Sequence, residues 1–269
     1  MYKEDEKGRT MKKVVLITGG TRGIGKATAK KFLKENYEVA IVSTGSNESL
    51  VKDLLDELSE EGTIKHYSAD ISKALDCEDV VKRVLEDFQQ VDVLANVAGI
   101  VGEQKNLWEL DNALIEKVID TNVMGSIYLA KHLSVHMKER GSGTIVNVGS
   151  IDGIIANHEN IAYHASKGAI RMFTQALGRE LGPYGVRVVS VGPGWIKTEM
   201  LMDQVDKNGP EMLETGGQMH MKGRIIEPEE IADVIYLMTL PEASAINGTT
   251  VMADDGYSAF KGVKQPTEV

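Results

Sequence analysis

A tyrosine and a lysine stand four residues apart, at positions 163 and 167. On a helix, residues i and i+4 share a face, so the phenol of Tyr163 and the ammonium of Lys167 would lie close together. The pKa of a free tyrosine is about 10, and a neighbouring positive charge lowers it by favouring the phenolate. The pair therefore predicts general acid–base chemistry at Tyr163, although the same spacing also occurs on ordinary solvated helices.

Two polar residues earlier in the chain could complete such a site. Ser150 follows the apolar stretch 144–148, and its hydroxyl could hold a carbonyl or alcohol oxygen beside the phenol. The alternative role of Ser150 is a turn or a helix cap. Asn122 lies inside a long predicted helical region, 111–140, although asparagine is a poor helix former. We interpret Asn122 as a polar link that positions water or Lys167, the alternative being a surface or kink residue.

A glycine-rich segment, Thr18–Gly25 (TGGTRGIG), joins the first predicted strand to the first predicted helix. Glycines let the backbone turn sharply and approach a pyrophosphate, and a helix N-terminus supplies free amides. A competing pattern, G-x-x-x-x-G-K, runs from Gly20 to Lys26, but Ala27 stands where a P-loop needs a serine or threonine to bind magnesium. The segment therefore favours a dinucleotide site over nucleotide hydrolysis, and no metal site is predicted.

Alternating strands and helices must position these residues. Strands are predicted at residues 14–18, 39–42, 64–67, 91–95, 144–148, 186–191 and 249–252, and helices at 24–36, 50–58, 80–88, 111–140, 162–181 and 228–240. Such units imply a parallel sheet with helices on both faces and a ligand site beyond the carboxyl ends of the strands. We predict one α/β domain, a doubly wound Rossmann fold at 12–258, with a disordered extension at 1–11 and a tail at 259–269.

Together these features resemble the short-chain dehydrogenase/reductase family over about residues 12–257. The glycine loop is similar to the family's T-G-x-x-x-G-I-G, and residues 96–99 (NVAG) are similar to its N-N-A-G motif. Residues 193–198 (PGWIKT) resemble the motif at the nicotinamide end, and residues 70–71 resemble the pair beside the adenine. The family's catalytic tetrad is matched in order and spacing by Asn122, Ser150, Tyr163 and Lys167.

The resemblance implies an NAD(P)-dependent oxidoreductase that acts on CH–OH groups. Tyr163 would exchange the proton, Lys167 would lower the pKa of the phenol and bind the ribose, Ser150 would hold the substrate oxygen, and Asn122 would relay protons through water. The residues that the resemblance places at the cofactor are Thr18, Gly19, Thr21, Arg22, Gly23, Ile24, Gly25, Ser43, Thr44, Asp70, Ile71, Asn96, Ala98, Gly99, Tyr163, Lys167, Pro193, Gly194, Ile196 and Thr198.

Two departures from the family pattern concern supporting residues. Val97 replaces the second asparagine of N-N-A-G, which weakens a structural hydrogen bond. Asp254, Asp255 and Gly256 stand where the family often has Asp-Gly-Gly, which puts the backbone turn near the C-terminus in question. Neither departure touches the tetrad.

The choice of cofactor rests on the end of the second strand. Dinucleotide folds that prefer NAD usually carry an acid there, which binds the ribose and repels a 2′-phosphate. Here Ser43 and Thr44 follow the strand, no carboxylate appears before Glu48, and Arg22 of the glycine loop offers a positive charge. We therefore favour NADP(H) over NAD(H). Because no second basic residue follows the strand, a pocket that accepts either cofactor is the alternative.

The substrate is predicted less closely. In the family the segment after residues 193–198 tends to cover the substrate, and here it carries flexible apolar side chains, Met200, Leu201, Met202, Met212, Leu213, Met219 and Met221. Residues 177–180 and 221–230 resemble bacterial hydroxysteroid dehydrogenases that act on bile acids. A 3-oxoacyl-thioester (ACP) reductase is the alternative. A non-catalytic dinucleotide-binding regulator is an alternative of another class, disfavoured because Tyr163 and Lys167 are both present.

Composition narrows the partners and the compartment. The net charge of −10 disfavours general nucleic-acid binding, and no apolar stretch approaches the roughly 20 residues that span a membrane. Cys77 is the only cysteine, which excludes an intrachain disulfide. We expect a cytoplasmic protein with a small-molecule ketone or alcohol as substrate. The resemblance, and apolar residues on more than one face of 111–140 and 162–181, predict a homodimer or homotetramer.

Overall fold

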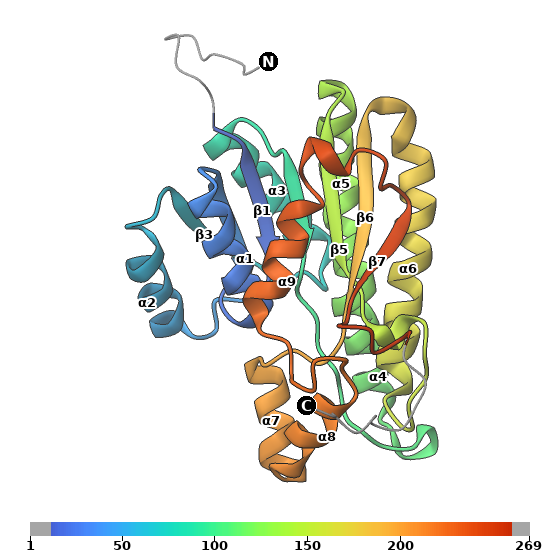
Figure 1. Ribbon diagram of the computed structural model, residues 1–269. Coiled ribbons are helices and arrows are strands. Elements are labelled where there is room, and N and C mark those ends of the chain that lie inside the picture. The colour runs from blue at the N-terminus through green and yellow to red at the C-terminus, as the bar shows by residue number, and fades with distance from the viewer. Residues whose placement is uncertain (1–11, 260–269) are drawn as a thin grey trace.

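The computed structural model describes residues 12–259 (Figure 1). The predicted extension at 1–11 and all but the first residue of the predicted tail lie outside the described residues. Seven parallel strands form one sheet in the order β3-β2-β1-β4-β5-β6-β7. The strands are β1 (Val14–Thr18), β2 (Glu38–Ser43), β3 (Ile64–Ser68), β4 (Val93–Asn96), β5 (Gly143–Val148), β6 (Val186–Pro193) and β7 (Thr249–Ala253). The predicted doubly wound α/β fold is confirmed.

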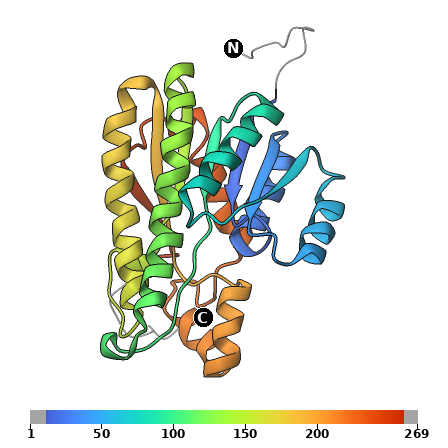
Figure 2. The same cartoon turned by 180° about the vertical axis from the view of Figure 1, so that it is seen from behind.

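Helices cover both faces of the sheet, as Figures 1 and 2 show. Side chains of β1 alternate between the two faces, so Leu16 packs with the cluster that includes α3 (Ala74–Phe88) and α5 (Gly125–Arg140). Ile17 packs with the opposite cluster, whose members come from α1 (Gly23–Lys34), α2 (Glu48–Leu58) and α9 (Pro228–Leu237). The longest helix, α6 (Ile161–Leu181), lies beside α5 on the first face. The strand order reverses between β1 and β4, which places the ligand crevice of such folds at their carboxyl ends.

The predicted helical region 111–140 is helical over residues 112–140, but one of its turns is a π turn that the sequence did not predict. The segment forms α4 (Asn112–Ile119), a π-helical turn (Asp120–Met124) and α5. The side chain of Asn122, inside the turn, donates from Nδ2 to the carbonyl of Ile100 at 2.9 Å and accepts from the backbone N–H of Ile100 at 2.8 Å. This long-range pairing holds the turn in the wider π geometry, which explains why the turn is not α-helical. Such π turns are frequent at functional sites.

The predicted methionine-rich segment forms two helices that we had not predicted, α7 (Glu199–Asn208) and α8 (Glu211–Gln218). They stand below the sheet in Figure 1, next to the carboxyl ends of the strands. We call residues 199–218 the α7–α8 arm.

Helix α3 begins six residues earlier than predicted. The sequence did not indicate its first turn, because Leu75 there is 78% exposed and departs from the apolar period of the rest of the helix. Within residues 12–259, no helix combines the length and the apolar character that a membrane crossing requires.

Candidate active site

The four predicted tetrad residues meet at the carboxyl ends of β4 and β5. Ser150 lies just beyond β5, where its hydroxyl accepts from the backbone N–H of Asp152 at 3.1 Å and caps a short helix, η3 (Ile151–Gly153). The Ser150 hydroxyl lies near the phenol of Tyr163, which projects from the first turn of α6, and it opposes the burial-driven rise in the pKa of that phenol. Ser150 therefore fills its turn role and its predicted place beside the phenol at the same time.

Lys167 lies one turn further along α6 and is only 5% exposed. Its Nζ donates to the carbonyl of Val148 at 2.8 Å and lies 5.5 Å from the centroid of the Tyr163 ring. Burial lowers the pKa of the ammonium to about 8, because desolvation penalises the charged form. Lys167 is thus fixed by the end of β5, within electrostatic reach of the phenol.

The expected lowering of the pKa of Tyr163 does not occur in this structure. Burial raises the pKa of the phenol above its ordinary value, the negative charge of Asp152 raises it further, and the Ser150 hydroxyl opposes the rise. Desolvation wins because the ammonium of Lys167 is turned to the Val148 carbonyl. The phenol is therefore held as a proton donor at neutral pH.

Asn122 is 2% exposed, and its amide is fully used. Besides the two bonds to Ile100, its Nδ2 donates to Ser166 Oγ at 3.0 Å, which ties the π turn to α6. A Cβ on Gly99 would lie 3.3 Å from Asn122 Oδ1 and 3.7 Å from Lys167 Nζ, so the 96–99 loop adjoins the tetrad. The structure brings Asn122 to the site and excludes its reading as a surface residue.

The glycine loop fits a pyrophosphate. A Cβ on Gly25 would lie 2.1 Å from the carbonyl of Gly19, so the turn requires glycine there. Among residues 12–259 the backbone N–H groups of Gly23, Ile24 and Gly25 have no acceptor, and the preceding Arg22 makes no side-chain cap. Three free amides at the positive end of a helix dipole are the donors that bind phosphate oxygens.

Several predicted cofactor residues lie beneath this loop as supports. Thr18 is 1% exposed, and its hydroxyl accepts from the backbone N–H groups of Val97 and Ala98, each at 3.0 Å. Asn96 is 4% exposed and donates to Asn147 at 2.9 Å, whereas its own Oδ1 is buried and has no partner in the part of the chain that the structure describes. These side chains shape the loop that would contact a cofactor.

The other end of the cleft is formed by β2 and β3. Ser43 Oγ lies 2.8 Å from Nε2 of His66, a residue that the sequence had not connected with the site. Thr44 and Arg22 are exposed, and Asp70 lies half-buried in the loop after β3, where bonds from Ser72 lower the pKa of its carboxyl. Ile71 is 8% exposed and packs against Gly125, so it contributes shape rather than an exposed contact.

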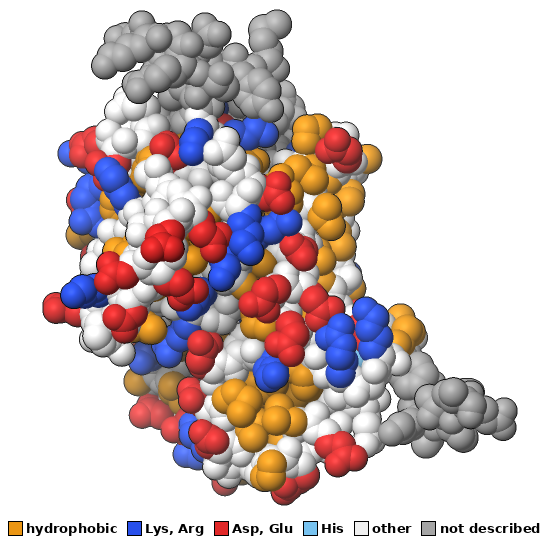
Figure 3. Space-filling view, turned by 60° about the vertical axis from the view of Figure 1, so that its left-hand side comes forward, with side chains coloured by type: hydrophobic (Ala, Val, Ile, Leu, Met, Phe, Trp, Pro, Cys, Tyr) orange, Lys and Arg blue, Asp and Glu red, His pale blue; other side chains and the backbone are white. Residues whose placement is uncertain are grey.

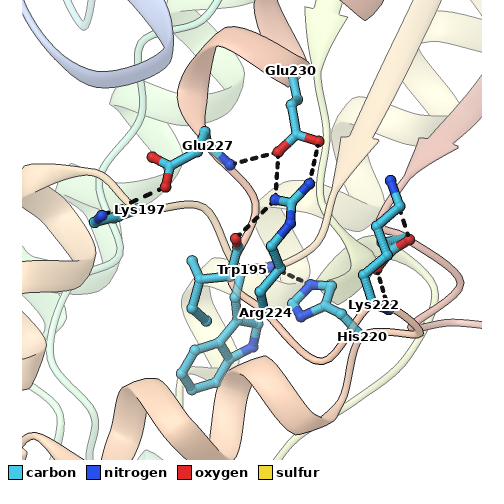
Figure 4. A network of polar contacts seen from close by, with 9 residues as sticks. Trp195, Lys197, His220, Lys222, Arg224, Glu227 and Glu230 are labelled. Carbon is cyan, nitrogen blue, oxygen red and sulfur yellow. Dashed lines mark hydrogen bonds and ion pairs between the residues drawn. The ribbon is translucent and has the colours of Figure 1, made fainter. Parts of the chain in front are cut away.

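The segment after β6 is held by a polar network (Figure 4). His220, 3% exposed, accepts from the backbone N–H of Trp195 at 3.2 Å and donates from Nδ1 to the carbonyl of Gly216 at 2.9 Å. Arg224 donates to both carboxylate oxygens of Glu230, at 2.7 and 2.8 Å. These contacts fix the segment of Pro193, Gly194, Ile196 and Thr198 over the crevice.

Thr198 reaches the glycine loop itself, because a Cβ on Gly23 would lie 3.1 Å from its methyl group. Two of the predicted cofactor segments, far apart in sequence, are therefore neighbours.

The backbone turn near the C-terminus forms although Asp255 replaces a glycine of the family pattern. Asp254 accepts from the backbone N–H groups of Gly256 and Ser258, at 3.1 and 2.8 Å, and Asp255 takes the left-handed conformation at φ 45°. Aspartate tolerates this conformation better than most residues other than glycine.

The α7–α8 arm and the turn after it expose methionine side chains. Met200, Met202, Met219 and Met221 are between 37% and 63% exposed, whereas Leu201 is buried against the body. Figure 3 shows hydrophobic side chains gathered in the lower part of the molecule, where the arm lies. The arm therefore presents an adaptable apolar surface near the catalytic end of the cleft.

Three residues near the tetrad were missed by sequence reasoning. Asp152 and His164 flank Ser150 and Tyr163 in sequence, and Tyr257 comes from the C-terminal turn. The charge of Asp152 acts on both Tyr163 and Tyr257, raising the pKa of each after the larger effect of burial. Only their adjacency to predicted catalytic residues could have drawn attention to Asp152 and His164.

Comparisons with known proteins agree with this geometry. The chain matches the family model described as short chain dehydrogenase over residues 13–209. It is 31% identical over 254 residues to a cyclopentanol dehydrogenase of Comamonas testosteroni, covering 94% of this chain and 99% of that protein. It is 32% identical over 244 residues to the 3-oxoacyl-[acyl-carrier-protein] reductase FabG of Vibrio cholerae serotype O1, covering 91% and 96%.

A solved structure, ElxO with NADP bound, is similar in fold, with a TM-score of 0.85 and 31% identity over 93% of this chain and 100% of that one. The fold and the site define an oxidoreductase that acts on CH–OH groups. The chain belongs to the short-chain dehydrogenase family, as predicted from its motifs.

Proposed function

We propose that the protein interconverts a ketone and a secondary alcohol, with NADP(H) favoured over NAD(H). The observation that carries the proposal is the meeting of Ser150, Tyr163 and Lys167 at the end of β5, across from the free amides of the glycine loop. A bound nicotinamide cofactor supplies or accepts the hydride.

In reduction, Tyr163 donates its proton to the substrate oxygen, and Ser150 holds that oxygen by its hydroxyl. The raised pKa of Tyr163 keeps the proton available until transfer. Lys167 stabilises the phenolate that remains and holds the ribose. Asn122, anchored to Ile100 and Ser166, keeps the π turn next to the Gly99 loop that adjoins Lys167, and we assign to it the proton relay through water. In oxidation of the alcohol, the same residues act in reverse.

The preference for NADP(H) is supported by the end of β2. Ser43 and Thr44 offer hydroxyl groups where a carboxylate would repel a 2′-phosphate, and the side chain of Arg22 on the glycine loop is exposed. Arg83 donates to the carbonyl of Ser68 at 3.3 Å, which brings a further positive charge near the end of β3. The related structure of ElxO has NADP bound, which supports the same choice.

For the substrate, we propose a hydroxysteroid or an apolar molecule of similar size, accommodated by the exposed methionines of the α7–α8 arm. A 3-oxoacyl thioester is the second candidate, favoured by the similarity to the FabG reductase. The test is an assay of hydroxysteroids, cyclic alcohols and 3-oxoacyl thioesters with both cofactors. A kcat/KM highest for the thioester overturns the steroid proposal, and turnover of none of them overturns the enzymatic one.

We also propose a homodimer or homotetramer in the cytoplasm, in which α5 and α6 pair between subunits. Val135 on α5 and Met172 on α6 are 58% and 60% exposed, and the two helices lie side by side on an open face (Figure 2). Apolar side chains on a continuous helical face favour association. Sedimentation at micromolar concentration tests this, and a monomer there contradicts it.

A further inference from the structure

The carboxyl group of Asp152 lies in the catalytic end of the cleft, and the reaction derived above does not use it. Asp152 stands in η3, two residues after Ser150, and its side chain is 18% exposed. Its Oδ1 accepts from Nδ2 of Asn157 at 3.0 Å and lies 3.5 Å from Nε2 of His164. Among residues 12–259 no hydrogen bond reaches Oδ2, and that oxygen is not sealed from solvent.

His164 does not bond the second oxygen of this carboxyl group. Its Nε2 accepts from the backbone N–H of Asn157 at 3.0 Å. Its Nδ1 lies 2.9 Å from the carbonyl oxygen of Asn160. Backbone groups therefore occupy both ring nitrogens, and the contact of the ring with Asp152 is to Oδ1 alone.

Within residues 12–259 the other titratable groups near Asp152 belong to the catalytic centre. Tyr163 and Lys167 lie near it on α6, and Tyr257 lies near it on the C-terminal turn. After the larger effect of burial, the negative charge of Asp152 raises the pKa of both phenols and opposes the lowering of the pKa of Lys167. The backbone N–H of Asp152 donates to the Ser150 hydroxyl at 3.1 Å, so Asp152 stands beside the catalytic serine with one carboxylate oxygen that no described residue bonds.

We propose that Asp152 determines specificity by accepting a hydrogen bond from a second donor, a hydroxyl group of the substrate near the reacting carbon, and by repelling substrates that carry a carboxylate there. The inference rests on the proposed function and narrows its substrate to hydroxy ketones and the corresponding diols. A hydrogen bond from a substrate hydroxyl to a charged carboxylate oxygen is stronger than one to a neutral acceptor, which gives the preference its physical basis.

The test compares substrates that differ in one group. Cyclohexanone has no second donor, 2-hydroxycyclohexanone has one, and 3-oxocyclohexanecarboxylate and its methyl ester differ in charge. A hydrogen bond to a charged group corresponds to about tenfold or more in kcat/KM. Wild type should therefore prefer the hydroxy ketone to cyclohexanone, and the ester to the carboxylate, each by about tenfold.

In Asp152→Asn both preferences should shrink to within about twofold, mainly through KM, because any change in the pKa of Tyr163 affects all of these ketones alike and cancels in the ratios. Asp53→Asn, which removes an exposed carboxylate on α2, is the charge-matched control and should keep both preferences. Binding of the reduced cofactor, followed by its fluorescence, should be equal in all three proteins. Equal preferences in wild type and Asp152→Asn overturn the inference, whereas turnover of no ketone by wild type overturns the proposed function instead.

The pH dependence of wild type gives a test that needs no variant. Burial raises the pKa of Asp152 above its ordinary value, and protonation removes its charge. The ratio of kcat/KM for 2-hydroxycyclohexanone over cyclohexanone cancels the titrations of Tyr163 and Lys167, which both substrates share. This ratio should fall as the pH is lowered below neutrality. A ratio that stays constant to the acid limit of stability contradicts the inference.

Discussion

The cleft has two ends that hold their polar groups in different ways. At the end of β5 and the start of α6, Lys167 and Asn122 are 5% and 2% exposed, and both are bonded to the backbone. At the ends of β2 and β3, Thr44 and Arg22 are exposed, and Ser43 has His66 as its side-chain partner. Changing a buried, bonded group leaves unpaired partners behind, whereas changing an exposed one leaves few. We therefore expect the buried groups to determine the reaction and a few replaceable side chains to determine the cofactor preference.

Removing the phenol proton should have the largest effect at the catalytic end. Tyr163→Phe keeps the ring and its packing but removes the acid, which should lower kcat by roughly a hundredfold to ten-thousandfold. Cofactor affinity should change little, because Lys167 and the glycine loop remain. Tyr184→Phe, on the exposed turn after α6, is the matched control. Near-normal turnover in Tyr163→Phe would remove that residue from the mechanism.

The pH profile is expected to separate the two directions of reaction. Alcohol oxidation needs the phenolate, and because the pKa of Tyr163 is raised, its rate should climb about tenfold per pH unit through the neutral and mildly alkaline range. Ketone reduction needs the phenol and should stay level there. Above the Lys167 pKa of about 8, loss of the ammonium should flatten the rise. A level oxidation profile, with hydride transfer limiting, argues against Tyr163 as the base.

At the β2 end, one substitution should change the cofactor preference. Ser43→Asp introduces the carboxylate that repels a 2′-phosphate and accepts from a ribose hydroxyl, so kcat/KM should move toward NAD(H) by about tenfold. Ser59→Asp, at the exposed end of α2, controls for charge alone. The preference is measured as the ratio of kcat/KM with the two cofactors. A wild type that already prefers NAD(H) contradicts the NADP(H) proposal.

His66 should modulate that change by a smaller factor. It lies 2.8 Å from Ser43 Oγ, so a carboxylate at position 43 could pair with the imidazole and lose part of its effect. Ser43→Asp combined with His66→Leu should therefore prefer NAD(H) about threefold more than Ser43→Asp alone. The dissociation constants of NADPH and NADH measure this. An identical preference in the single and double variants would show that the imidazole does not couple to position 43.

Motifs and periodicity were enough to place most of the site. The glycine loop, Ser150 and the segment after β6 were predicted because each follows a buried strand, and parallel strands bring their carboxyl ends to one edge of a sheet. Asn122, Tyr163 and Lys167 were predicted from their order and spacing in the sequence. The α7–α8 arm was not predicted as helical, because its exposed methionines give no clear helical period. The π turn at Asn122 was not predicted because its cause, the pairing of Asn122 with the backbone of Ile100, involves a residue 22 positions away.

The sequence by itself therefore determined the fold class, the family and the identity of the groups that do chemistry, since these depend on residue type, order and local period. Only the tertiary structure decided how those groups are tuned. The pKa of Tyr163 rises because the phenol is buried and lies near the charge of Asp152, whereas the ammonium of Lys167 is bonded to the carbonyl of Val148. His66 meets Ser43 because β2 and β3 pair in register. Solvation and long-range contacts set these properties, and neither is encoded in the spacing of residues along the chain.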